Sequence, residues 1–289
     1  MTREYENRTW QSPDGLALHF RDYAADTGRE ARAPIVCLPG LTRNARDFAE
    51  LADALSGPRR VLCPDMRGRG ESEYAKDSAS YNPATYVGDV FALLAQEGIE
   101  RFVSIGTSLG GLMTMMIAAT KPEMLAGAVL NDIGPDIAPE GIAHIRDYVG
   151  QARSFPTWVH AARALQELHG AAHPAFGLDD WIGFAKRGMT LGASGRVQFD
   201  YDMAIAEPFA EDDGAAPPDL WPMFEALTGR PVLLVRGGLS GLLTEQTFAE
   251  MQRRLPGVEA VTVNDVGHAP LLTEPPAMAA IRSLLERAP

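Results

Sequence analysis

The chain has 289 residues, of which 46% are hydrophobic and 22% charged, a balance typical of a globular protein. Lys and Arg number 26 against 38 Asp and Glu, and the resulting net charge of -12 disfavours nucleic acids and anionic membrane surfaces as partners. The first eight residues are polar and no apolar run approaches about 18 residues, so we expect no signal peptide, no membrane span and a cytoplasmic location. Cys37 and Cys63 end apolar runs and are expected to be buried free thiols.

Along the chain, short apolar strands alternate with helical patterns. Residues 8–23 hold two alternating runs around a Pro-Asp-Gly turn at 13–15, which predicts a pair of strands. Further strands are predicted at 35–38, 60–63, 101–105, 125–130, 232–235 and 259–263, and helices at 47–55, 85–97, 111–119, 245–255 and 275–287. Strands that alternate with helices through short links predict a parallel sheet covered on both faces.

This alternation breaks between residues 134 and 229. The stretch contains little β-like sequence and several helical patterns with scattered aromatic residues. We therefore predict an α/β core made of residues 1–133 and 230–289, with a helical cap, residues 134–229, inserted between two strands. The aromatic and methionine side chains of the cap suit an apolar or aromatic substrate, although most of them are expected to form the core of the cap itself.

Residues 106–110 read GTSLG and lie between a predicted strand and a predicted helix. At such a turn the hydroxyl of Ser108 is pushed away from the backbone, and the flanking glycines leave room for the tight bend. The helix that follows directs its free N–H groups and the positive end of its dipole at the same place. Ser108 is therefore a candidate nucleophile for attack on an acyl carbon.

Among the six histidines, His268 lies just after the last predicted strand. Loops at the carboxyl ends of parallel strands share one edge of the sheet, so His268 and Ser108 are expected at the same edge. His169 and His173 are four residues apart, but Gly170 lies between them and no acidic partner pattern follows, so no metal site is expected.

Four segments in order resemble the α/β-hydrolase fold superfamily, in its cap-bearing, esterase-like branch. Residues 38–41 (LPGL) resemble the oxyanion loop, 65–72 (DMRGRGES) the D-x-R-G-x-G-x-S loop, 106–110 the nucleophile elbow and 267–268 (GH) the loop of the catalytic histidine. The resemblance implies a mostly parallel eight-stranded sheet and an oxyanion hole made by the backbone N–H groups of Leu41 and Leu109. The serine at the elbow, rather than an aspartate, argues against a dehalogenase or an epoxide hydrolase.

The chain departs from the family pattern at the acid that should orient the histidine. In most members this acid follows the strand after the cap, and the matching position here is Gly241. Three interpretations stay open: the acid is Asp132, at the end of the preceding strand as in some haloalkane dehalogenases and lipases; Glu245 takes its place; or the acid is lost. Asp265 is near His268 in sequence but is expected to turn away.

The resemblance implies a serine hydrolase that cleaves a carboxylic ester through an acyl-enzyme, with Ser108, His268 and Asp132 as catalytic residues. The implied substrate is a small molecule, and no cofactor or metal is expected. Two alternatives remain open: C–C bond hydrolysis of diketone-like ring-cleavage products, and a non-catalytic or weakly active ligand-binding relative that has lost its acid at Gly241. The sequence gives no oligomeric state.

Overall fold

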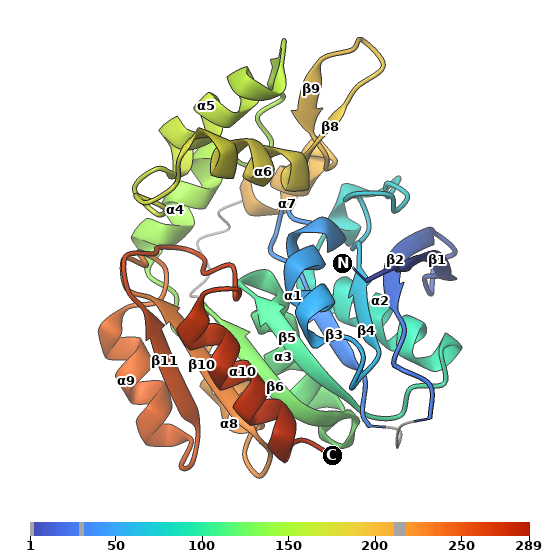
Figure 1. The fold of residues 1–289 in the computed structure, drawn as a ribbon, viewed down its shortest axis with the longest axis vertical. Helices are drawn as coiled ribbons and strands as arrows, with labels where there is room; N and C mark the ends of the chain where they lie inside the picture. The colour runs from blue at the N-terminus through green and yellow to red at the C-terminus, as the bar shows by residue number, and fades with distance from the viewer. Residues whose placement is uncertain (1–2, 29–31, 211–217) are drawn as a thin grey trace.

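The computed structural model describes residues 3–28, 32–210 and 218–289. An eight-stranded sheet with the strand order β1-β2-β4-β3-β5-β6-β10-β11 runs through the centre of the molecule (Figure 1). β2 is antiparallel to both of its neighbours, and every other adjacent pair is parallel. The strands are β1 Glu6–Gln11, β2 Ala17–Tyr23, β3 Ile35–Leu38, β4 Val61–Pro64, β5 Phe102–Thr107, β6 Leu125–Asn131, β10 Val232–Gly237 and β11 Glu259–Val263. The predicted α/β sheet is thus confirmed.

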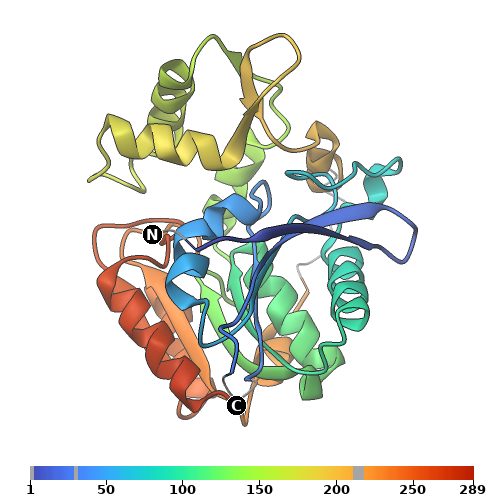
Figure 2. The same cartoon turned by 45° about the vertical axis from the view of Figure 1, so that its right-hand side comes forward.

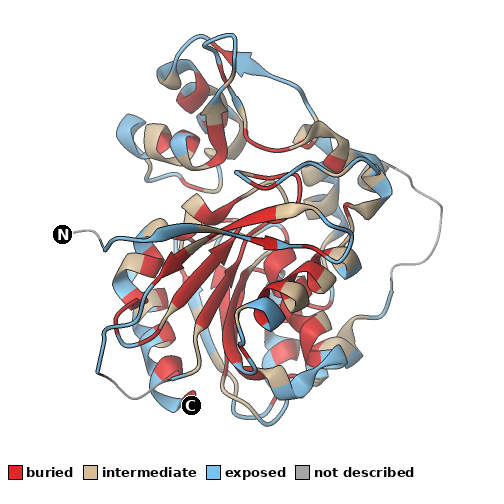
Figure 3. Ribbon diagram, turned by 90° about the vertical axis from the view of Figure 1, so that its right-hand side faces the viewer, coloured by how far each residue is buried: buried red, intermediate tan, exposed pale blue. Residues whose placement is uncertain are grey.

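Helices cover both faces of this sheet, as the alternation of elements predicts. The covering helices are α1 Ala49–Leu55, α2 Pro83–Gln96, α3 Leu109–Thr120, α8 Trp221–Glu225, α9 Glu245–Arg254 and α10 Pro275–Arg287. Buried residues of α2, α3, α8 and α9 form one apolar core, whereas those of α1 and α10 form a second core. Successive residues of β10 alternate between the two cores, as the two-residue period of a strand requires. The inner strands β3, β4, β6 and β10 are buried along their whole length, whereas the edge strand β1 is mostly exposed (Figure 3).

Short 3-10 helices, Ala45–Phe48, Ser78–Ser80, Pro122–Met124 and Met203–Ala206, join some of these elements. The first of them replaces the predicted beginning of the helix at 47–55. The side chain of Asn44 caps it by accepting a hydrogen bond from the Arg46 backbone N–H.

The segment of residues 139–210, which follows β6, rises above the carboxyl edge of the sheet (Figure 2). Its elements are α4 Pro139–Tyr148, β7 Ser154–Phe155, α5 Trp158–His169, α6 Leu178–Gly188, β8 Met189–Leu191, β9 Val197–Phe199 and α7 Glu207–Ala210. β7, β9 and β8 form a small antiparallel sheet that the helical interpretation of residues 134–229 did not predict. Strands of two or three residues are too short to show a periodic pattern. α8 belongs instead with the sheet, since Phe224 lies in the core that contains α3.

Charged and polar contacts hold this segment against the sheet. Arg46 pairs with Asp200 through its guanidinium and also donates to the Arg187 carbonyl. The Tyr81 hydroxyl donates to the Asp202 carboxylate across 2.6 Å. In the described parts of the chain, we find no helix that is both long and apolar enough to cross a bilayer.

Candidate active site

Ser108 occupies the turn between β5 and α3, as the GTSLG pattern predicts. Its backbone has φ 53° and ψ -115°, a conformation that residues with a side chain rarely adopt. A side chain at Gly106 would overlap the Gly110 carbonyl, and one at Gly110 would overlap the Leu38 carbonyl of the neighbouring strand. The glycines are therefore required by close backbone approach, and they let the serine point out of the turn.

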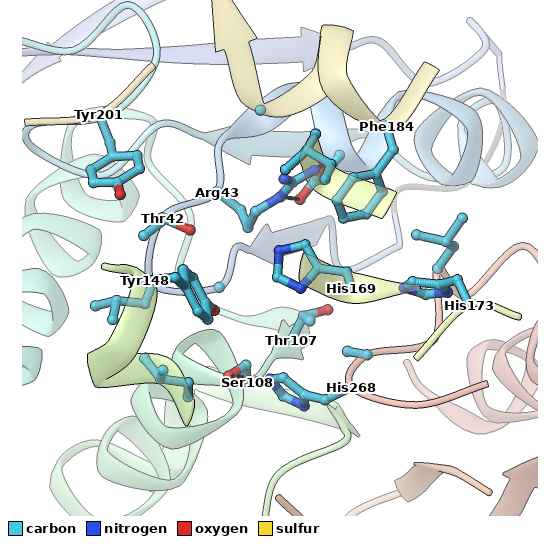
Figure 4. Close-up of a pocket in the computed structure, with 18 of the residues that line it drawn as sticks. Thr42, Arg43, Thr107, Ser108, Tyr148, His169, His173, Phe184, Tyr201 and His268 are labelled. Atoms are coloured by element: carbon cyan, nitrogen blue, oxygen red, sulfur yellow. Dashed lines mark hydrogen bonds and ion pairs between the residues drawn. The ribbon is translucent and has the colours of Figure 1, made fainter. Parts of the chain in front are cut away.

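A continuous chain of hydrogen bonds joins three side chains at the carboxyl edge of the sheet. Nε2 of His268 lies 3.0 Å from Oγ of Ser108 (Figure 4). Nδ1 of the same ring lies 2.7 Å from Oδ2 of Asp132. The three residues follow β5, β6 and β11, so the parallel strands bring together groups that are far apart in the sequence. This arrangement matches the order nucleophile, base and acid that a serine hydrolase needs.

The Asp132 carboxylate is fully buried and has two further donors. Its Oδ1 accepts from the Gly237 backbone N–H at 2.8 Å, and its Oδ2 accepts from the Ser240 hydroxyl at 2.6 Å. The backbone of Asp132 has φ 54°, so this strand end, like that of Ser108, is held in a rarely populated conformation. Donors from two sides hold this carboxylate in one orientation, in which Oδ2 also faces the imidazole of His268.

The other candidate acids lie elsewhere. The Glu245 side chain is 87% exposed in the first turn of α9, with its carboxylate 3.8 Å from Nη1 of Arg236. Asp265 is exposed. Gly241 is exposed too, and a side chain there would meet nothing within 4 Å. Of the three interpretations of the acid, the geometry therefore favours Asp132.

The two expected oxyanion donors lie beside Ser108. Leu109 is the first residue of α3, where backbone N–H groups have no acceptor within the helix. Leu41 lines the pocket in front of the serine, and its carbonyl accepts a 2.8 Å hydrogen bond from Nε of the buried Arg69. Arg69 belongs to the D-x-R-G-x-G-x-S loop, so that motif restrains the backbone of the loop after β3.

A cavity of about 120 Å³ opens onto the serine (Figure 4). The loops at the strand ends contribute one set of walls, among them Gly40, Thr42, Thr107 and Pro270. The segment between β6 and β10 contributes the other set, which is largely apolar or aromatic: Ile145, Tyr148, Leu165, His169, His173, Phe184, Phe199 and Tyr201. A small organic molecule with an apolar body fits such a lining.

Most titratable groups of this second set are electrically neutral. Burial lowers the pKa of His169 to about 3 and that of His173 to about 4, and the Arg43 cation acts in the same direction. Burial raises the pKa of Tyr148 to about 12. The His173 ring stacks on Phe176 with 4.5 Å between centroids, so it packs as an aromatic ring. Nowhere among the described residues do three potential metal-binding side chains gather.

Sequence reasoning missed Ser240, Arg43 and the role of the two histidines as pocket walls. Ser240 stands next to Gly241, the position that matches the acid of most family members. Its hydroxyl, a possible hydrogen-bond donor, is the signal that the sequence offers. Arg43 lies two residues after the LPGL run, close enough to suggest a place in the same site. The spacing of His169 and His173 bears only on metal binding, because helical spacing does not reveal which cavity a helix faces.

Comparison with known proteins agrees with the fold. Residues 33–275 match the family model described as "alpha/beta hydrolase fold". A solved alpha/beta hydrolase from Novosphingobium aromaticivorans is 59% identical, with a TM-score of 0.93 over 99% of this chain and 100% of that one. A 3-hydroxybutyrate-oligomer hydrolase from Cupriavidus necator is 38% identical over 83% of this chain and 84% of its own length. Esterase Rv0045c from Mycobacterium tuberculosis is 26% identical over 84% of this chain and 79% of its own length. The chain therefore belongs to the alpha/beta hydrolase fold family.

Proposed function

We propose that the chain is a serine hydrolase that cleaves the carboxylic ester of a small or medium-sized, apolar or aromatic substrate through an acyl-enzyme. The observation that carries this proposal is the hydrogen-bonded chain Ser108–His268–Asp132, with distances of 3.0 and 2.7 Å. Hydrolase and esterase names among the relatives support it. The 3-hydroxybutyrate-oligomer hydrolase makes short hydroxy-acid oligoesters a sensible first substrate to assay.

In the proposed reaction, Nε2 of His268 accepts the proton of Ser108 while Oγ attacks the ester carbonyl carbon. The N–H groups of Leu41 and Leu109 stabilise the oxyanion that forms on the carbonyl oxygen. Collapse of this intermediate breaks the ester C–O bond, and the imidazolium gives its proton to the departing alcohol. Water then attacks the acyl-enzyme by the same route, which releases the acid and restores Ser108.

Asp132 holds Nδ1 of His268 as the protonated nitrogen, so that Nε2 faces the serine as a base, and it stabilises the imidazolium that follows. The contact between these two side chains weighs against the non-catalytic alternative, which rested on a missing acid at Gly241. The reaction needs no cofactor. Residues 134–229 are proposed to act as the cap that sets specificity, because they supply the apolar walls of the cavity. A cytoplasmic location stays a prediction.

The test uses the intact protein and p-nitrophenyl esters of short and medium chain length. We expect hydrolysis above background, and covalent labelling by a fluorophosphonate that disappears in Ser108→Ala. A C–C hydrolase would label at Ser108 but cleave diketones in preference to esters. The proposal would be refuted if the folded wild-type protein showed no ester hydrolysis above background and no labelling by the fluorophosphonate.

A further inference from the structure

Arg43 places a guanidinium in the wall of the cavity (Figure 4). Its Nε and Nη2 atoms donate to the Asp47 carboxylate, and its Cζ atom lies 4.4 Å from the ring centroid of Phe184. Among the described residues, Nη1 has no hydrogen-bond partner. A side chain at Gly188 would overlap this atom, so the glycine allows the guanidinium to pack close to the backbone at the end of α6. One end of a partly buried cation is thus left available to a ligand.

The wall around Arg43 carries more positive than negative charge. Asp47 is the only carboxylate among the lining residues that the structure describes, and it also lies 3.7 Å from Nε of Arg187. The Nε atom of Arg187 is buried without a hydrogen-bond partner in the described parts of the chain. Glu50, 4.0 Å from the other end of Arg187, is 74% exposed and therefore screened by water. Two guanidinium groups consequently share one partly buried carboxylate.

The neighbouring groups do not cancel this excess. The lowered pKa values of His169 and His173 and the raised pKa of Tyr148 leave all three uncharged at neutral pH. The chain as a whole has a net charge of -12, so a surplus cation at this place runs against its general composition. Bidentate, planar recognition of a carboxylate is the task for which arginine is best suited.

Arg43 is also close to the reacting serine. A side-chain atom placed on Gly40 would lie 3.5 Å from Cγ of Arg43 and 3.8 Å from Cβ of Ser108. The two side chains therefore flank one residue, and a single small molecule can contact both. Ile145, Leu165 and Phe199 supply apolar surface for the remainder of such a molecule.

We infer that Arg43 is a specificity-determining residue, and that the preferred substrates are small esters that carry a free carboxylate. This inference rests on the proposed function and names the substrate class of the same site. The carboxylate belongs either to the acyl part or to the alcohol part of the ester, and in both cases it binds the open end of the guanidinium.

The experiment compares charged esters with uncharged esters of the same shape. Monoethyl glutarate is matched by ethyl valerate for an acyl-side carboxylate, and 4-acetoxybutyrate by butyl acetate for an alcohol-side carboxylate. In the wild type, kcat/KM is expected to be higher for the charged member of at least one pair. That pair shows whether the preferred carboxylate belongs to the acyl part or to the alcohol part of the ester. Arg43→Met should lower the charged-to-uncharged ratio by about 10- to 100-fold, the worth of a charge-assisted hydrogen bond.

Two further variants complete the series. Arg43→Lys keeps the charge but loses the planar fork, so it should retain part of the preference. Arg163→Met removes one positive charge from the exposed face of α5, away from the cavity, and should leave both rates unchanged.

A purely structural role for Arg43, such as holding Asp47 or Phe184, would lower both rates of a pair equally, and this outcome would overturn the inference. Because Asp47 still faces Arg187 in Arg43→Met, the variant is expected to fold, as thermal unfolding will check.

A binding measurement separates this inference from the proposed reaction. In Ser108→Ala, calorimetry should show that monoethyl glutarate or 4-acetoxybutyrate binds and that its uncharged match binds at least about tenfold more weakly. The double variant Ser108→Ala, Arg43→Met should lose this difference. If no ester is hydrolysed by the wild type but the difference is present, the reaction is wrong and the carboxylate site stands. Equal binding of charged and uncharged esters would refute the site.

Discussion

The Ser240 hydroxyl donates a 2.6 Å hydrogen bond to Oδ2 of Asp132, the same oxygen that His268 contacts from the other side at 2.7 Å. The chain after β10, where most relatives are expected to carry their acid, thus contributes a hydroxyl that supports an acid from β6. This relationship explains how the site is assembled without a carboxylate at Gly241, and it leads directly to the first two predictions.

Asp132→Asn is expected to lower kcat by about 10⁴-fold, since an amide favours the wrong imidazole tautomer and cannot stabilise the imidazolium. The protein should remain folded, because the amide has nearly the same shape. Ester hydrolysis and circular dichroism measure the two effects. The matched control is Asp265→Asn, an exposed aspartate three residues from His268. Unchanged activity in Asp132→Asn would reduce Asp132 to a residue of the strand end.

Ser240→Ala should lower kcat about tenfold, because it removes one charge-assisted hydrogen bond to the carboxylate without removing the carboxylate. Ser240→Thr retains a hydroxyl and should recover most of the lost rate. A kcat equal to that of the wild type in Ser240→Ala would mean that Gly237 alone suffices to fix Asp132.

Gly241→Asp should change the wild-type rate little, since Asp132 already occupies the imidazole nitrogen that faces away from Ser108. Space for the new side chain is present, as nothing lies within 4 Å of it. A strong rise in kcat on this single substitution would instead show that the site lacks an effective acid. Steady-state kinetics with one short-chain ester distinguishes these results.

Stability should decline on mild acidification because His169 and His173 are held neutral. Their pKa values of about 3 and about 4 in the folded state lie below the value of about 6.5 in an unfolded chain. Between these limits the unfolded state binds more protons, so the stabilising contribution is complete above pH 7 and is lost as the pH falls. At pH 5 each of the two histidines lowers the free energy of unfolding by about 2 kcal/mol relative to its value above pH 7.

Chemical unfolding at pH 7.5 and pH 5 checks this expectation in His169→Gln and His173→Gln. Each variant should lose less unfolding free energy between the two pH values than the wild type. His160→Gln, an exposed position on α5, serves as the control and should follow the wild type. Identical pH dependence in all four proteins would contradict the assigned burial of the two rings.

Gly110→Ala and Gly88→Ala form a pair that tests the packing of the serine turn. The first places a methyl group against the Leu38 carbonyl and should destabilise the protein by about 2 kcal/mol or more, with loss of activity. The second lies in α2 with nothing within 4 Å, so it should stabilise the helix by about 0.5–1 kcal/mol. Thermal unfolding of the two variants should therefore shift in opposite directions.

The sequence was sufficient to predict the core elements and the meeting of Ser108 with His268, because both depend on local patterns and on one rule of parallel sheets. Asp132 is a candidate because some relatives carry the acid at the end of this strand, but nothing local in the sequence chooses between Asp132, Glu245 and a lost acid. That choice depends on which side of the imidazole each strand end reaches, which is a three-dimensional relationship.

Other features were beyond the reach of pattern reasoning for physical reasons. Strands β7, β8 and β9 are too short to carry a period, and they are stabilised by pairing between distant segments. The position of Arg43 after the LPGL run places it near the site, but its contacts with Phe184 and Gly188, more than a hundred residues later, cannot be predicted from local pattern. Burial of His169 and His173 likewise results from the way α5 and the turn after it face the cavity.

The walls of the cavity come from two separate stretches of chain, one at the strand ends and one between β6 and β10. The first stretch holds Ser108, His268 and Arg43, whereas the second supplies most of the apolar walls. We expect that mutation of the second stretch changes the apolar walls of the cavity and leaves the hydrogen bonds of Ser108 and His268 in place. Directed evolution toward uncharged substrates of other shapes is therefore best aimed at residues 139–201, whereas a change in charge preference requires Arg43.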